Sequence, residues 1–195
     1  MRAKLCLFLL IPMFGGCITF EVKKLSDTPG ISNCYHLVSE KDKKSIVFLS
    51  NEAKLDTALR NDGKIYAVNA MQLLDCMSHY DSCLLYDWSW NCASSHCILL
   101  SACEDYCRKY NYKLFVFTTY YEFPAMQTQS SGLSFPLLVV NHQYYGTDYK
   151  NYIKQFDDEI CGSDYYDHRK NWGKRFLVFK KGKFDRAVSE IELLN

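Results

Sequence analysis

The sequence predicts an α/β protein with a mixed central sheet flanked by helices. Two observations support this class. From residue 65 onward, short apolar runs alternate with helical patterns, and strands separated by helices of this length pair in parallel. The chain ends in two further apolar runs joined by Lys181-Gly182, which predicts an antiparallel hairpin. The length of 195 residues, of which 48% are hydrophobic, is enough for one domain with a small extension.

The segment before residue 64 is predicted to be a β-rich extension. Residues 17–63 contain short apolar runs that are broken by turn residues, and residues 45–50 are rich in β-formers. A short helix is expected just after them, because apolar residues fall on one helical face at Ala53, Leu55, Ala58 and Leu59.

The elements after residue 64 follow one another clearly. Residues 65–68 are predicted to form a strand, and Met71, Leu74, Cys76 and either Leu73 or Met77 supply the apolar side of a helix that ends near Tyr80. Further strands are expected at residues 83–88, 113–120 and 135–141, and helices at residues 97–110 and 148–160. In the last of these helices the apolar face is formed by Tyr149, Tyr152, Ile153 and Phe156. The final hairpin covers residues 175–188.

The first sixteen residues are typical of an export signal. Arg2 and Lys4 precede an apolar run, residues 5–14, that is too short to span a bilayer. The run ends in Gly15-Gly16-Cys17, which resembles a bacterial lipoprotein signal, although Phe14 stands where that family more often has leucine. The resemblance implies a diacylated Cys17 that anchors an exported protein to a bacterial membrane, on the periplasmic side of the cell envelope. The alternative is an ordinary secretory signal with an incidental cysteine.

Charge argues against a nucleic-acid partner. The chain has 23 basic and 22 acidic residues, and the basic ones are scattered along it. A nucleic-acid surface needs a concentrated basic patch, so we expect none here.

Eight cysteines remain after the signal and Cys17 are set aside. An even number in an oxidising compartment predicts that some are paired, and the connectivity stays open. Cys103 and Cys107 lie four apart on a predicted helix, which is poor geometry for a disulfide, so we expect core thiols there. The better candidates for structural bridges are Cys34, Cys76, Cys83 and Cys161.

The run from residue 83 to residue 97 carries the candidate chemistry. A strand, an aromatic loop containing Trp88 and Trp90, then Cys92 and a helix follow one another, and "WSWNC" is similar to the Trp-x-x-Trp-Cys run of thioredoxins with one residue moved. Over about two-thirds of the chain, the sequence resembles the thioredoxin superfamily, and in particular the exported, lipid-anchored thioredoxin-like proteins of Bacteroidetes. The resemblance implies a nucleophilic Cys92, because a helix N-terminus stabilises a thiolate, and a resolving Cys97 in the first helical turn.

The spacing departs from the superfamily, which has two residues between its cysteines where this chain has four. A bridge still closes if the two Cα atoms come within about 4.4 to 6.8 Å. His96 either lowers the pKa of a neighbouring thiol or is an exposed loop residue. A zinc site built on Cys92, His96 and Cys97 lacks the paired two-residue spacings of such sites, so we expect no metal and no cofactor.

Two more features of the superfamily can be sought. Its buried acid, which helps to move protons, would fall at Tyr86, whereas the acid here is Asp87. One residue along a strand turns a side chain to the opposite face, so we do not expect Asp87 to take that role. Its cis-proline would be Pro136 in a simple layout. In the longer layout of the exported members, which we favour because a helix and a hairpin follow Pro136, the strand facing the site is residues 175–179. The residues before that strand are Trp172, Gly173 and Lys174.

The sequence therefore predicts three parts: a signal (residues 1–16), an anchor with a β-rich extension (residues 17–63) and a thioredoxin-like domain (residues 64–195). The expected function is thiol-disulfide exchange at Cys92 and Cys97, with protein thiols or disulfides of the envelope as partners. The alternative is a non-enzymatic lipoprotein with structural cysteines, whose tyrosine-rich surface binds a partner, since a fold alone does not confer an activity.

Overall fold

The computed structural model describes residues 33–90, 98–146, 148–163, 165, 166, 171 and 173–191. Its helices are the 3-10 helix η2 (Tyr35–Leu37), α1 (Glu40–Lys43), α2 (Ala70–Ser78), α3 (Leu100–Lys109), α4 (Phe123–Ser130), α5 (His142–Tyr145) and α6 (Tyr149–Cys161). Its strands are β1 (Ile46–Phe48), β2 (Ile65–Val68), β3 (Ser82–Asp87), β4 (Lys113–Thr118), β5 (Leu138–Val140), β6 (Phe176–Lys180) and β7 (Lys183–Val188).

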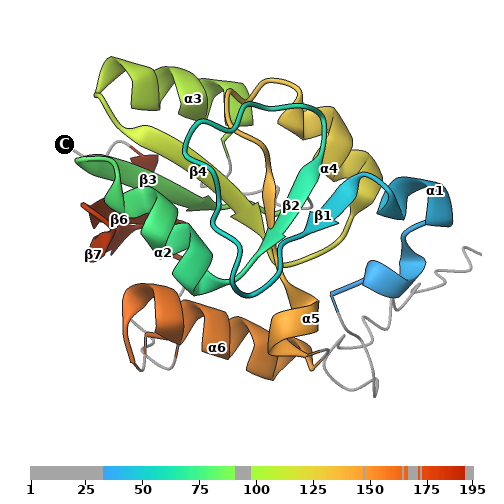
Figure 1. Ribbon diagram of the computed structural model, residues 1–195. Coiled ribbons are helices and arrows are strands. Elements are labelled where there is room, and N and C mark those ends of the chain that lie inside the picture. The colour runs from blue at the N-terminus through green and yellow to red at the C-terminus, as the bar shows by residue number, and fades with distance from the viewer. Residues whose placement is uncertain are drawn as a thin grey trace, which may run out of the picture.

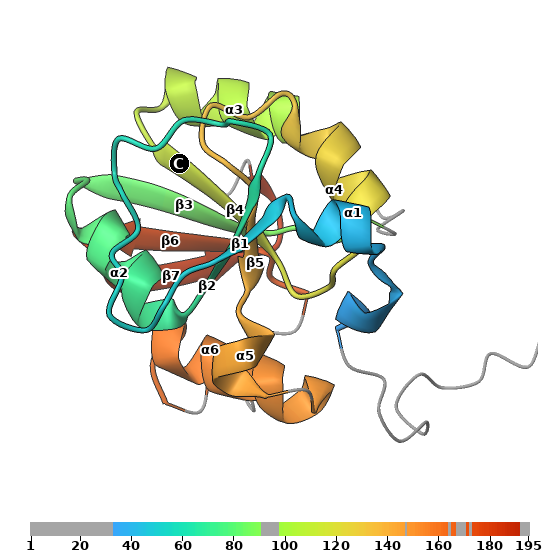
Figure 2. The same cartoon turned by 45° about the vertical axis from the view of Figure 1, so that its right-hand side comes forward.

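The strands form one mixed sheet in the order β1-β2-β5-β4-β3-β6-β7. The first five strands in this order run parallel, whereas β6 pairs antiparallel with β3 and β7 pairs antiparallel with β6. Helices cover the sheet on both sides, α3 and α4 on one face and α2, α5 and α6 on the other (Figures 1 and 2). The structure therefore confirms the predicted α/β class, with a parallel portion and a terminal antiparallel hairpin.

Two hydrophobic clusters hold these layers together, one on each face of the sheet. β3 contributes to both because its side chains alternate: Leu84 and Tyr86 pack under α3, while Cys83 and Leu85 pack against α2 and α6. All four are fully buried. A strand that is buried on both faces belongs in the middle of a sheet, and β3 accordingly lies between β4 and β6.

Local signals in the sequence account for two of the elements. Asn69 and Gln72 form a capping box at the start of α2, each side chain accepting a hydrogen bond from the other residue's backbone N–H. Lys181 and Gly182 both have positive φ, +50° and +73°, which is the conformation that a two-residue hairpin turn requires. The Gly182 turn also lies close to α2, since an added Cβ would come 2.9 Å from the Leu74 carbonyl oxygen.

The segment before residue 64 is only partly as predicted. β1 is confirmed as a strand, and it joins the same sheet by pairing in parallel with β2. The short helix expected over residues 53–59 is wrong, because residues 49–64 contain turns and no helix. The Gln72 side chain donates hydrogen bonds to the carbonyl oxygens of Ser50 and Ala53, at 2.7 and 3.0 Å, and so provides those carbonyls with partners outside a helix.

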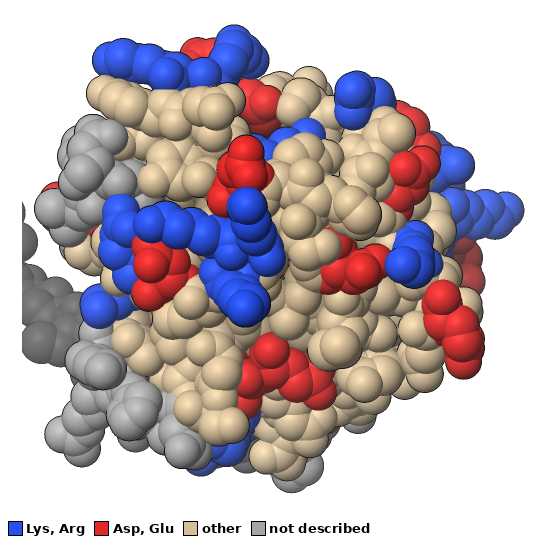
Figure 3. Space-filling model, turned by 60° about the vertical axis from the view of Figure 1, so that its left-hand side comes forward, with Lys and Arg blue, Asp and Glu red and all other residues tan. Residues whose placement is uncertain are grey.

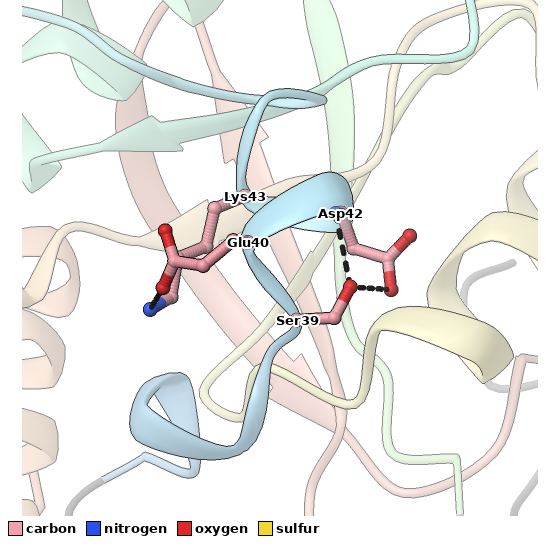
Figure 4. Close-up of polar contacts among 4 residues, drawn as sticks. All are labelled: Ser39, Glu40, Asp42 and Lys43. Carbon is pink, nitrogen blue, oxygen red and sulfur yellow. Dashed lines mark hydrogen bonds and ion pairs between the residues drawn. The ribbon is translucent and has the colours of Figure 1, made fainter.

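The first described residues are fixed by contacts of their own. Ser39 caps α1, accepting a hydrogen bond from the Asp42 N–H at 3.2 Å and donating one to its carboxylate at 2.7 Å (Figure 4). Tyr35 packs against His142 of α5, with ring centroids 4.4 Å apart. Residues from Asn33 onward therefore lie against the edge at which the parallel strands end.

Candidate functional site

The site is built at the end of β3, the strand that leads to the two candidate cysteines. The Trp88 N–H donates to the Phe117 carbonyl of β4 at 2.8 Å, and the Asp87 N–H donates to the Arg175 carbonyl at 2.9 Å. Both neighbouring strands therefore hold the chain at the point where it leaves the sheet. Cys92, His96 and Cys97 follow directly and lie outside the described residues, as does Cys17.

The two tryptophans of the predicted motif have different environments. Trp88 is buried in the cluster under α3, whereas Trp90 is 49% exposed. Tyr86, two residues before Trp88, shares its face and stacks on Phe176 of β6 at 4.6 Å between ring centroids. The Trp88 side chain thus belongs to the core beneath the site, and the Trp90 side chain is available at the surface.

Helix α3 begins later than the sequence predicted. Its first residue is Leu100, and the preceding Leu99 has an extended backbone conformation. Cys97 therefore comes three residues before the helix, rather than within its first turn. The N-cap residue, Leu99, makes no side-chain capping bond.

The structure places Lys174 near the end of β3, whereas Pro136 lies elsewhere in the sheet. Lys174 and Arg175 directly precede β6, and the Arg175 guanidinium donates to the Asp87 carbonyl oxygen at 3.4 Å. Pro136 is buried before β5, which pairs with β2 and β4, so that β4 stands between it and β3. The peptide bonds of the described residues, including the one before Pro136, are trans.

Asp87 faces the opposite side of the sheet from Trp88. It lines a cavity of about 320 Å³ together with Ile153 and Asp157 of α6, and with Tyr165 and Lys174. Burial raises the pKa of the Asp87 carboxyl to about 6, and the positive charge of Arg175 opposes that rise. A second cavity of about 380 Å³ shares Tyr165, Asn171 and Lys174 with the first and continues toward β7.

Asp157 and the cavity were not anticipated from the sequence. Burial raises the pKa of the Asp157 carboxyl well above its usual value, and the negative charges of Asp87 and Asp158 raise it further. The available signal was spacing, because Asp157 lies four residues after Ile153 and next to Phe156 on the apolar side of α6.

The six described cysteines are free thiols, namely Cys34, Cys76, Cys83, Cys103, Cys107 and Cys161. Cys103 and Cys107 are buried in the cluster under α3, which confirms the prediction of core thiols. The prediction of structural bridges among Cys34, Cys76, Cys83 and Cys161 is wrong, because all four are free.

Burial makes most of these thiols poor nucleophiles. It raises the pKa of Cys76 to about 11 and that of Cys83 to about 12, and it raises the pKa of Cys34 and of Cys161 as well. The pKa of Cys103 is raised mainly by a hydrogen bond with Cys107 and also by burial. The thiolate is the attacking form, so a raised pKa makes these thiols less reactive at neutral pH.

The tyrosines are mainly structural. Tyr121 and Tyr152 are buried, and both hydroxyls donate to the Val140 carbonyl oxygen, at 3.0 and 2.6 Å. Tyr145 is buried as well and donates to the Glu159 carboxylate at 2.6 Å. These contacts connect the ends of β4 and β5 with α5 and α6. The neighbouring Tyr144 of α5, by contrast, is exposed.

The surface near the hairpin carries charges of both signs. Asp185 lies 3.7 Å from the Lys180 ammonium and 2.7 Å from the Arg186 guanidinium. Lys and Arg side chains lie among Asp and Glu side chains over the face shown in Figure 3.

Neither a metal centre nor a membrane span is found among the described residues. No group of three or more His, Cys, Asp or Glu residues converges there in a way that suits a metal ion. None of the helices there has the length and apolar character needed to cross a bilayer.

No protein-family model, curated protein or solved structure matches the chain.

Proposed function

We propose that the chain is a thioredoxin-like lipoprotein of the bacterial cell envelope that carries out thiol-disulfide exchange at Cys92 and Cys97. The observation that carries the proposal is the position of β3. It is a central, fully buried strand, and its last residues are fixed by β4 on one side and by the start of β6 on the other. The chain passes from there through Cys92 and Cys97 to α3, and this strand-loop-helix order is the one in which the thioredoxin fold reaches its redox site.

The sheet topology supports the longer layout of the exported thioredoxin-like proteins. In that layout the strand facing the site is residues 175–179, and β6, which contains most of them, pairs antiparallel with β3. Pro136 precedes a different strand, separated from β3 by β4. The residues next to the site on this side are therefore Lys174 and Arg175, and neither is a proline.

The remaining cysteines support Cys92 and Cys97 by elimination. The six described thiols are free, and burial raises the pKa of most of them. A reactive thiolate needs a partly exposed site with a low pKa. Among the cysteines that follow Cys17, Cys92 and Cys97 are the two that these observations leave as candidates.

The start of α3 favours a second candidate function. Since α3 begins at Leu100, seven residues of the sequence lie between Cys92 and the helix, whereas a cysteine activated by a helix N-terminus directly precedes or begins its helix. A protein without redox activity, in which the exposed Trp90 contacts a partner, is consistent with this separation along the sequence.

One experiment separates the two functions. The purified protein is treated with a thiol reagent over a range of pH and compared with Cys92→Ser and Cys97→Ser, with Cys34→Ser as the matched control at a partly exposed cysteine. A thiol that reacts fast at neutral pH and is lost only in Cys92→Ser supports exchange. An inert Cys92, or a Cys92–Cys97 bridge with a reduction potential below about −300 mV, supports the non-enzymatic protein instead.

The lipid anchor is tested separately. A mass spectrum of the mature N-terminus is expected to show diacylglycerol on Cys17. An unmodified N-terminus at another residue contradicts the anchor and leaves the exchange chemistry untouched.

A further inference from the structure

We propose that residues 33–38 form a strap that closes over His142 and opens when that histidine is protonated. The strap consists of the 3-10 helix η2 with the two residues before it and the one after it. When closed, it covers a cluster of rings formed by Phe48, Tyr121 and His142. The inference is independent of exchange at Cys92, and it assigns an acid-sensitive control of access to this part of the sheet.

The three rings of the cluster come from three parallel strands. Phe48 is the last residue of β1, Tyr121 comes three residues after β4, and His142 two residues after β5. The His142 ring centroid lies 5.2 Å from those of Phe48 and Tyr121. Tyr35 of η2 packs on His142 with ring centroids 4.4 Å apart and on Tyr121 with centroids 5.0 Å apart. It also packs on Phe48, at 5.5 Å. Tyr35 is therefore the side chain that joins the strap to the cluster.

A hydrogen bond orients the His142 ring beneath Tyr35. Its Nδ1 atom lies 3.1 Å from the Tyr121 hydroxyl oxygen. That hydroxyl donates to the Val140 carbonyl oxygen at 3.0 Å, so it accepts from His142, and Nδ1 carries the proton of the neutral ring. The proton that is taken up in acid therefore goes to Nε2, and it places a positive charge among the rings.

The strap is held by few other contacts. The Tyr121 N–H donates to the Asn33 carbonyl oxygen at 2.8 Å, and the Val38 side chain is buried. Cys34 has a φ of +64°, a left-handed conformation that costs energy in a residue other than glycine. The Asn33 amide nitrogen is buried and has no hydrogen bond of ordinary geometry among the described residues, although the Tyr152 hydroxyl lies near it. Backbone strain and a poorly satisfied donor both oppose the closed strap.

A charge on His142 opposes the closed strap as well. Burial lowers the pKa of the imidazole below its ordinary value of 6.5, with no charged group as a further cause. An open strap returns the ring to water, where the pKa is ordinary. The open form therefore binds the proton more tightly, so the closed strap is favoured above about pH 6.5 and loses stability as the pH falls below that value.

The charged and titratable groups around His142 and the strap come from each element that packs there. They are Cys34, Tyr35 and His36 of the strap, Lys43 of α1, Tyr120, Tyr121 and Glu122 after β4, and Tyr144 and Tyr145 of α5. The Lys43 ammonium lies 5.3 Å from the centroid of the Tyr35 ring and is paired with Glu40. His36 is exposed, so it provides a matched control for His142 within the strap.

The first arm of the test measures how often the strap opens. Hydrogen exchange of the Tyr121 N–H, which donates to the strap, is followed at pH 5 and pH 8 in the purified protein and corrected for the intrinsic exchange rate. We expect its protection at pH 5 to fall at least about threefold more than that of the buried β3 amides. His142→Phe keeps a ring in the cluster and should abolish this fall, whereas His36→Asn should keep it. No fall in the unsubstituted protein, a fall shared equally by β3, or the same fall in His142→Phe overturns the inference.

The second arm uses the reciprocity of linkage. If protonation opens the strap, opening the strap must favour protonation to the same extent. The titration of the His142 ring is followed by NMR in the purified protein and in Tyr35→Ala, which removes the ring that closes over it, with Tyr35→Phe as the control that keeps a ring there. The midpoint should rise in Tyr35→Ala and stay close to that of the unsubstituted protein in Tyr35→Phe. Equal midpoints in all three proteins overturn the coupling between His142 and the strap.

Discussion

Replacing Asp87 by asparagine should stabilise the folded protein at pH 8 and change it little at pH 4. Folding raises the pKa of this carboxyl from about 3.9 in the unfolded chain to about 6. The folded state therefore binds the proton more tightly, so the contribution of Asp87 to stability is fully present below about pH 4 and is lost as the pH rises through 6. Asparagine has the same size and stays neutral, which removes this loss.

The magnitude follows from the shift. Two pKa units at about 1.4 kcal/mol each give about 3 kcal/mol at pH 8, and less than about 0.5 kcal/mol at pH 4. Because water in the cavity screens the charge, about 1 to 3 kcal/mol is the expected range at pH 8. For a chain of this length each kcal/mol shifts the melting temperature by about 2 to 4 °C.

The assay is urea unfolding of the protein and of Asp87→Asn at both pH values, with Glu52→Gln as the control for removing an exposed carboxylate. The quantity to compare is the difference in unfolding free energy between pH 4 and pH 8. If Asp87→Asn changes stability equally at the two pH values, or lowers it at pH 8, the carboxyl is not held in a desolvated cavity and the reasoning is refuted.

Three further predictions concern packing. Burial raises the pKa of Cys76 to about 11 and that of Cys83 to about 12, so both should be alkylated at pH 8 only when the protein is unfolded. Peptide mass mapping that detects labelling of either thiol in the native protein within minutes would contradict this. Gly182→Ala should lower the free energy of unfolding in urea by about 1 to 3 kcal/mol more than Gly63→Ala does. Both positions have positive φ, but only an added Cβ at Gly182 would meet α2. Equal losses would show that the close approach is unimportant. Phe156→Ala should lower the free energy of unfolding by about 3 to 5 kcal/mol, since its fully buried ring packs on Phe117 and Tyr145. A loss below about 1 kcal/mol would contradict a place for α6 in the core.

The elements that the sequence predicted well are those with strong local signals. β2 has the predicted bounds, and the hairpin turns at Lys181-Gly182 as expected, because a two-residue turn with positive φ favours glycine. In α6 the predicted apolar face is correct at Tyr152 and Phe156, both of which are buried. In each case the pattern that determines the structure lies within about a dozen residues.

The elements that were wrong or missed depend on contacts distant in sequence. The expected helix over residues 53–59 is absent where the side chain of Gln72 binds the Ser50 and Ala53 carbonyls. Met71 was assigned to the apolar face of α2 and is 64% exposed, since the tertiary packing of α2 buries Leu73 and Met77 instead. Helix α4 has almost no amphipathic pattern to reveal it, although Phe123 and Met126 are buried.

The prediction of bridges among Cys34, Cys76, Cys83 and Cys161 failed for a different reason. An even number of cysteines in an exported chain favours bridges, but composition says nothing about which thiols face one another. Cys83 lies on a central strand, and its thiol donates to the Met77 carbonyl oxygen at 3.5 Å. A thiol in such a position is used as a core side chain, so cysteine count was a weaker guide than burial would have been.

Asp87 shows how a correct inference from sequence can lead to an incomplete conclusion. Alternation along a strand predicted that Asp87 faces away from Trp88, and the structure confirms it, because Trp88 packs under α3 while Asp87 lines a cavity with α6. Facing away from the tryptophan would isolate the carboxyl from the chemistry only if that side of the sheet were solidly packed. It contains a cavity with a second carboxyl group, and α6, which supplies that group, is the element that a motif-based comparison leaves out. The comparison of Asp87→Asn with the unsubstituted protein at pH 4 and pH 8 therefore tests whether this carboxyl lies in a cavity or against a solidly packed face.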